Sequence, residues 1–248
     1  MYVYSDSVND MLKSAFIYSH TGQFPLHSSE VDNSLFSINI TPVNSISWSD
    51  IFLLNPRFQS AKKEIQNSML IPLVLLNLRY SSDDKHSLII EGLKNAIENS
   101  VIKFCSDYNP VFTKLTKRKN CCLREVHKML GLIRFTPVNH KLAGVALLEH
   151  NTADLILYRF RKRYPKEHLV LLVGSDTVEL NSVDEIIIGK ADNYIPFIKN
   201  DDFTSVWKKY YESQYIPSRK NLKLLQHHIP KKYWNWLTEG DFIKSKLN

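Results

Sequence analysis

The chain has 248 residues, of which 44% are hydrophobic and 11% aromatic, so it can bury a core of ordinary size. Its longest apolar run, at 69–78, contains a proline and an asparagine and is roughly half as long as a membrane span, so no transmembrane helix is expected. The three cysteines exclude a disulfide framework and an ordinary zinc or iron–sulfur ligand set, and the first residues do not resemble a secretory signal. We therefore expect a cytoplasmic protein without a cofactor or a metal ion.

Positive charge is concentrated in two segments. From Lys114 to Arg163 the sequence has twelve Lys or Arg against three acidic residues, and from Thr204 to Asn248 it has nine against three. The stretches 1–113 and 164–203 are acidic, with eight basic against eleven acidic residues and three against eight. Two basic segments in an otherwise acidic chain indicate a localised cationic patch and an acidic partner such as nucleic acid.

The N-terminal half is predicted to be mainly helical. A short strand at Tyr2–Tyr4 precedes a helix to about Ser19, for which Ser5, Asp6 and Ser7 are candidate caps. Apolar and polar residues alternate over 35–40, which is typical of a half-buried strand. A helical insertion is expected over about 50–110, with helices at 60–68 and from Asp83 or Asp84 to about Ser106, and an apolar segment at 72–80.

The C-terminal half is predicted to contain the main sheet. A helix over 114–130, with one apolar and one cationic side, precedes strands at 132–137 and 142–148. There follow a helix at 151–164, strands at 169–173 and 177–180, an apolar segment at 186–188, and a helix after Asp201 and Asp202. The order strand, strand, helix, strand, strand predicts an α+β fold with a mainly antiparallel sheet and helices on one face. We expect a single domain over 1–248, ending in a helical, basic and aromatic segment at 204–248.

Three segments of the chain carry a family resemblance. "REVHKMLGLIRF" at 124–135, the pair Glu149-His150 before a helix ending in "FRKRY", and "RKN" followed by "PKKYW" within 219–234 are similar to a bacterial domain-of-unknown-function family of DNA metabolism or DNA repair proteins. The resemblance implies a partner: a radical-SAM DNA repair protein, or the uracil-DNA-glycosylase-like uracil-DNA-binding proteins to which the same domain is fused. The chain departs from the family at Glu149, where Asp is usual, at Arg159, where His is frequent, and at 173–177, where a basic strand is expected.

The basic segments supply the candidate nucleic-acid contacts, because cations bind phosphate and aromatic rings stack on unpaired bases. Alternatives remain: a solvated helix face for the cations at 117–119, an internal ion pair for Arg134, and core packing for the rings. The candidate binding residues are Lys117, Arg118, Lys119, Arg124, Arg134, Arg161, Arg163, Arg219, Lys220, Asn221, Lys231, Lys232, Tyr233 and Trp234.

Acid–base chemistry has three candidate residues, His127, Glu149 and His150, because an imidazole beside a carboxylate can transfer protons. If they meet in one cleft, the protein is a nucleic-acid hydrolase or a nucleotide-modifying enzyme. In the structural alternative, Glu149 and His150 orient the helix that follows them. A third alternative is a non-catalytic adaptor that binds an acidic protein. The leading prediction is a DNA metabolism or repair protein that binds single-stranded or damaged DNA through a basic groove.

Overall fold

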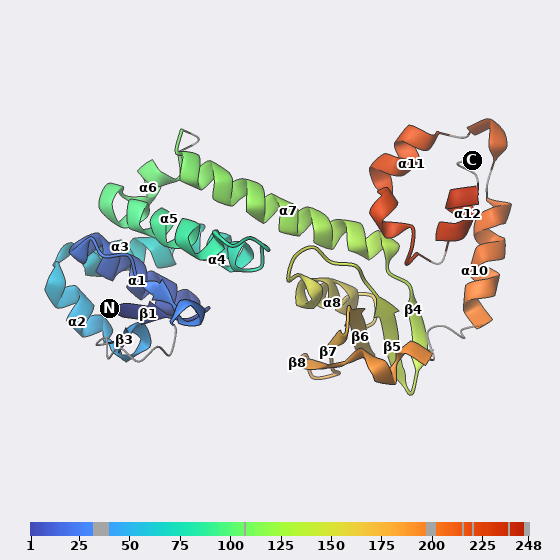
Figure 1. Cartoon of the computed structure of the whole chain (residues 1–248), viewed down its shortest axis with the longest axis horizontal. Helices are drawn as coiled ribbons and strands as arrows, with labels where there is room; N and C mark the ends of the chain where they lie inside the picture. The colour runs from blue at the N-terminus through green and yellow to red at the C-terminus, as the bar shows by residue number, and fades with distance from the viewer. Residues whose placement is uncertain are drawn as a thin grey trace. The chain divides into compact units, whose positions relative to one another are not determined.

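The computed structural model describes residues 1–31, 40–106, 108–196, 202–214, 216–219, 221–237 and 239–245. The chain divides into two compact units, Met1–Cys122 and Leu123–Asn248, where the sequence predicts one domain (Figure 1). Each unit has a hydrophobic core of its own. The boundary falls within the long helix α7, Pro110–Leu132, whose two ends belong to different units.

Unit 1 is mainly helical, as predicted. Ser7 caps α1, and its hydroxyl accepts a hydrogen bond of 3.0 Å from the backbone N–H of Asp10. Helix α1 ends at Gly22, which has φ 70°, and it packs against α5. The core between these two helices includes Met11, Phe16 and Ile89. The helices of this unit, besides the start of α7, are α1 Val8–Thr21, η1 Ser28–Glu30, η2 Val43–Ser45, α2 Trp48–Leu54, α3 Arg57–Gln66, α4 Leu70–Leu78, α5 Lys85–Asn99 and α6 Val101–Phe104.

A small parallel sheet completes unit 1. Its strands are β1 Tyr2–Tyr4, β2 Leu26–His27 and β3 Thr41–Pro42, in the order β2-β1-β3. The predicted strand at 35–40 falls almost wholly outside the described residues. The helix predicted up to Ser106 is interrupted at Ser100, whose φ of 75° breaks the α-helical backbone and separates α5 from α6.

Unit 2 contains a five-stranded sheet in the order β4-β5-β6-β7-β8. The α+β class is confirmed, but the sheet is mixed, because β5 and β6 are parallel while the other neighbours are antiparallel. The helix predicted at 151–164 is present as α8, Ala153–Arg161, but the prediction of a mainly antiparallel sheet did not consider that this helix crosses between β5 and β6 and so lets them run in the same direction. The strands are β4 Phe135–Val138, β5 Lys141–Val145, β6 His168–Val173, β7 Asp176–Leu180 and β8 Ile186–Lys190.

Both faces of this sheet are packed. Leu169 and Leu171 of β6 face α8, while Val170 and Leu172 join a smaller cluster on the opposite face, as the alternation of a strand requires. The C-terminal part of α7 contributes Met129 to the α8 side of the core. The other helices that the structure describes in this unit are η3 Ala191–Asn193, α10 Asp202–Ser213, η4 Pro217–Arg219, α11 Leu222–His228, η5 Lys231–Tyr233 and α12 Gly240–Ser245. Among the described residues, no helix is both long and apolar enough to cross a membrane.

Candidate nucleic-acid interface

The carboxylate of Glu125 in α7 anchors the loop that precedes α8. It accepts hydrogen bonds from the backbone N–H of Glu149 at 2.6 Å, from that of His150 at 3.2 Å and from the hydroxyl of Thr152 at 2.7 Å. Glu125 is only 7% exposed, and a buried carboxylate is tolerated only when donors surround it. The "REVHKM" and "EH" segments are therefore joined through a residue that sequence reasoning did not select.

A salt bridge joins the same loop to the C-terminal segment. Lys232 donates a hydrogen bond to the carboxylate of Glu149. This hydrogen bond holds the pKa of the Glu149 carboxyl below its ordinary value. Burial opposes the charged form of Lys232, but its bonds to Glu149 and Tyr233 outweigh this effect and raise the pKa of the ammonium group. Both groups are therefore charged at neutral pH.

Cations from two distant segments lie around one aromatic ring. The Nζ atoms of Lys128 and Lys232 lie 5.7 Å and 4.9 Å from the centroid of the Tyr233 ring. Arg124 is exposed one helical turn before Lys128, and Lys231 is exposed beside Lys232. We call this group of four cations the α7–η5 basic surface: Arg124, Lys128, Lys231 and Lys232.

The two aromatic rings predicted to contact a base are buried instead. Tyr233 is 2% exposed and lies in the main core of unit 2, and Trp234 is 7% exposed. The indole N–H of Trp234 donates a hydrogen bond of 2.9 Å to the carbonyl of Ile229, so the one donor of this side chain is satisfied. Their burial fits the alternative of core packing, in which both rings fix the C-terminal segment in place, better than stacking on an unpaired base.

Arg134 and Arg161 make internal contacts. Arg134 lies 3.7 Å from the buried Glu239 carboxylate and stacks at 4.7 Å over the Trp207 ring, so the internal ion pair expected as an alternative is present. Arg161 donates a hydrogen bond of 2.8 Å to the carboxylate of Asp184. It also donates hydrogen bonds to backbone carbonyls in the loop after α8 and at the end of β7. These bonds use every N–H-bearing nitrogen of the Arg161 guanidinium, which indicates a structural role.

The other predicted binding residues are spread over both units. Arg118 is buried in unit 1, where it pairs with Asp84 and stacks at 5.0 Å on Tyr80. Lys117 is exposed and Lys119 half-buried on the same helix. In unit 2, Arg163 stacks 5.5 Å over Phe160, Arg219 is exposed, Asn221 caps α11 with a 3.0 Å bond from Leu224, and Lys220 lies outside the described residues.

The three acid–base candidates have different surroundings. Glu149 and His150 are neighbours, with both backbone N–H groups bound to Glu125. His127 is exposed on α7, two residues beyond Glu125. Because Lys232 engages the Glu149 carboxylate and lowers its pKa, Glu149 is a poor proton donor at neutral pH.

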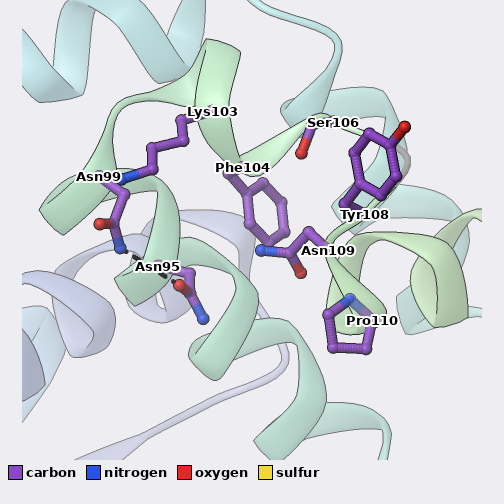
Figure 2. A pocket seen from close by; sticks show the side chains of 8 residues that line it. All are labelled: Asn95, Asn99, Lys103, Phe104, Ser106, Tyr108, Asn109 and Pro110. Carbon is purple, nitrogen blue, oxygen red and sulfur yellow. Dashed lines mark hydrogen bonds between the residues drawn. The ribbon is translucent and has the colours of Figure 1, made fainter.

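A pocket of about 270 Å³ lies elsewhere, in unit 1. Figure 2 shows Asn95 and Asn99 of α5, Lys103 and Phe104 of α6, and Asn109 just before α7 around it. Asn109 is engaged as a cap, because its side-chain oxygen accepts bonds from the N–H groups of two following residues. No residue predicted from the sequence to act in binding or catalysis lines this pocket.

Comparison with known families gives one result. The model of the DUF4130 family, described as a domain of unknown function, matches residues 83–239, which is more than half of the chain. The chain belongs to the DUF4130 family. The DUF4130 match contains the whole α7–η5 basic surface and confirms the resemblance to a domain of unknown function. No curated protein and no solved structure matches the chain.

Proposed function

We propose that this DUF4130 protein binds nucleic acid through the α7–η5 basic surface and acts in DNA metabolism, within DNA repair. The observation that carries the proposal is the approach of Lys128 and Lys232 to the same Tyr233 ring from segments far apart in the sequence. Each cation adds a phosphate contact and releases a condensed counterion, so binding is expected to weaken steeply with salt.

The loop anchored by Glu125 supports this assignment. When no nucleic acid is bound, the carboxylate of Glu149 pairs with the ammonium of Lys232 at the surface. A phosphate oxygen is an equally good acceptor for that ammonium, so Glu149 acts as a stand-in that a nucleic-acid backbone displaces. The buried rings favour backbone recognition over base stacking, and hence binding with little dependence on sequence.

The biological setting comes from the family resemblance. It supplies DNA repair as the process, a radical-SAM DNA repair protein or a uracil-DNA-binding protein as the partner, and single-stranded or damaged DNA as the ligand. The cytoplasm is the expected compartment. None of these depends on a contact within the structure, so each is tested separately from binding itself.

The binding test compares two matched charge variants. Lys231→Gln/Lys232→Gln removes half of the α7–η5 basic surface, whereas Lys208→Gln/Lys209→Gln removes the same charge from the exposed side of α10. Labelled single-stranded, duplex and uracil-containing DNA are titrated by fluorescence anisotropy at two salt concentrations. We expect the first variant to bind more weakly, with a salt slope reduced by about one per lost phosphate contact, and the second to match wild type. Equal binding by both variants, or binding that ignores salt, refutes the proposal.

The enzyme alternative is tested in the same samples. A hydrolase or nucleotide-modifying enzyme that uses His127, Glu149 and His150 must release products when DNA is incubated with a divalent metal ion. Products that disappear in His150→Asn would establish catalysis. Binding without products leaves the binding proposal in place.

A further inference from the structure

Two histidines and an aspartate from three separate elements converge in unit 1. Asp6 lies in the turn between β1 and α1, His27 ends β2, and His86 lies in the first turn of α5. The ligand atoms of the three side chains lie within 4.8 Å of one another. Asp6 Oδ1 is 2.6 Å from His86 Nε2 and 3.4 Å from His27 Nε2.

The two imidazoles are arranged as ligands rather than as a hydrogen-bonded chain. Their rings stack with centroids 4.3 Å apart and planes inclined by 26°, so both Nε2 atoms face the same carboxylate. Both Nε2 atoms are buried, and the partner that each of them faces is the single carboxylate of Asp6. One mostly exposed carboxylate is shared between two buried imidazole nitrogens, and a cation bound to all three groups would satisfy both nitrogens at once.

Neighbouring groups hold the histidines in this orientation. The Tyr4 ring, 3% exposed, packs edge-on against His27 at 5.3 Å and against His86 at 6.1 Å. Ser29 Oγ lies 2.6 Å from His27 Nδ1. A metal ion on Nε2 places the ring proton on Nδ1, which then donates a hydrogen bond to Ser29 Oγ, and metal-binding histidines are commonly oriented by such a bond from their other ring nitrogen. With a proton on Nδ1, the new hydrogen bond to Ser29 Oγ takes the place of the 3.2 Å bond that Nδ1 accepts from the backbone N–H of Ser29.

The site is open on the carboxylate side. The Asp6 side chain is 62% exposed, whereas those of His27 and His86 are 11% and 16% exposed. Solvent therefore reaches the carboxylate, which provides an entry path and leaves coordination positions for water or a substrate. Two imidazole nitrogens and one carboxylate oxygen suit zinc, iron and related ions and are a poor set for Mg²⁺ or Ca²⁺, which prefer oxygen ligands.

We propose that Asp6, His27 and His86 bind a divalent transition-metal ion of the Zn²⁺ class. The site is independent of the α7–η5 basic surface, because all three ligands belong to unit 1. The sequence does not indicate this site, because its ligands lack the close spacing of common metal-binding motifs. The pairing of β1 with β2 and the position of α5 bring them together in the fold.

The test uses the full chain after treatment with a chelator. Calorimetric titration with Zn²⁺ is expected to give one tight site, and Co²⁺ is expected to develop the visible absorption of a nitrogen-ligated ion. Mg²⁺ and Ca²⁺ should give no comparable heat. Asp6→Asn and His86→Ala should abolish tight binding, and Ser29→Ala should weaken it about 10- to 100-fold.

Two controls make the result decisive. His227→Ala/His228→Ala removes the exposed adjacent pair of unit 2 and should bind as wild type. Circular dichroism of each metal-free variant establishes that it is folded, and Asp6→Asn, which changes an exposed side chain, serves if His86→Ala does not fold. No Zn²⁺ or Co²⁺ binding by the wild type, binding that survives Asp6→Asn in a folded protein, or binding lost only in the His227/His228 variant overturns the proposal.

Discussion

Lys232 donates a hydrogen bond to the carboxylate of Glu149, and this bond ties the C-terminal segment to the loop before α8. The same two residues come from two of the three segments that carry the family resemblance. The third segment contributes Glu125, which binds the backbone of that loop. The family's recognisable residues therefore meet at one place in unit 2, and most of the predictions below concern it.

Removing the negative charge of Glu149 should increase affinity for DNA. In Glu149→Gln, Lys232 loses its anionic partner, and the net positive charge at the α7–η5 basic surface increases. We expect several-fold tighter binding at low salt and a smaller gain at high salt, where charges are screened. Anisotropy titration measures this change, with Glu167→Gln, an exposed glutamate of the same unit, as the control. Weaker binding by Glu149→Gln would show that the carboxylate itself contacts the ligand.

Loss of the Glu125 carboxylate should destabilise unit 2. Glu125→Ala leaves the buried Thr152 hydroxyl and the partly buried N–H groups of Glu149 and His150 without their acceptor, which should cost about 2–4 kcal/mol. Urea unfolding followed by circular dichroism measures the loss, with Glu167→Ala for comparison. Amide hydrogen exchange at Glu149 and His150 should accelerate in the same variant. Unchanged exchange at both amides would contradict the anchoring role.

Glu179 should make the stability of unit 2 depend on pH. Its buried carboxylate receives bonds of 2.9 Å from Lys141, 2.8 Å from His168 and 2.9 Å from Tyr194. Burial favours the neutral acid, but the bonds from Lys141 and Tyr194 outweigh burial and lower the pKa of Glu179. A depressed carboxyl pKa stabilises the fold above the unfolded value, near 4.3, and this contribution disappears as the pH falls through the folded value.

The corresponding variant is Glu179→Gln. At pH 7 it should be less stable than wild type by about 2 kcal/mol, and the difference should shrink as the pH falls below about 4. Urea unfolding at a series of pH values tests this. A difference that grows on acidification would mean that the ionised form of Glu179 is not what stabilises the sheet.

Two glycines should respond to alanine in opposite directions. A Cβ atom on Gly240 would overlap the carbonyl oxygen of Trp234, so Gly240→Ala must displace the backbone at this contact. A Cβ on Gly131 meets nothing within 4 Å, and Gly131 lies inside helix α7. We expect Gly131→Ala to stabilise by up to about 1 kcal/mol and Gly240→Ala to destabilise and expose the Trp234 indole, as measured by thermal unfolding and tryptophan fluorescence. Similar melting temperatures for the two variants would contradict the close contact at Gly240.

The elements that sequence could predict are those coded by local signals. Ser7 before α1 and Gly174 between β6 and β7 mark boundaries with cap and turn chemistry that acts over a few residues. The continuous apolar run at 169–172 is likewise typical of a strand buried on both faces, as β6 is. Local signals do not specify strand direction, and so the parallel pairing of β5 with β6 was not anticipated.

The candidate sites depended on long-range contacts and were predicted less well. The sequence indicated Glu149, Lys231 and Lys232, but not that Glu125 would hold the loop, because a lone glutamate on a basic helix resembles a solvated residue. A stronger signal was available: Glu125 lies between Cys122 and Met129, on the side of α7 that is buried. Tyr233 and Trp234 were expected to contact a base, yet their apolar area is used to hold the chain end against the core.

The packing of α1 against α5 limits how this chain can be shortened. The family match begins at residue 83, just before α5, and so leaves out the helix that covers the apolar side of α5. An excised 83–239 fragment would expose Ile89 and Leu93 to water and should aggregate. The segment that matches the family is therefore not expected to fold on its own in this protein. Expression trials should retain the residues before 83, which include α1.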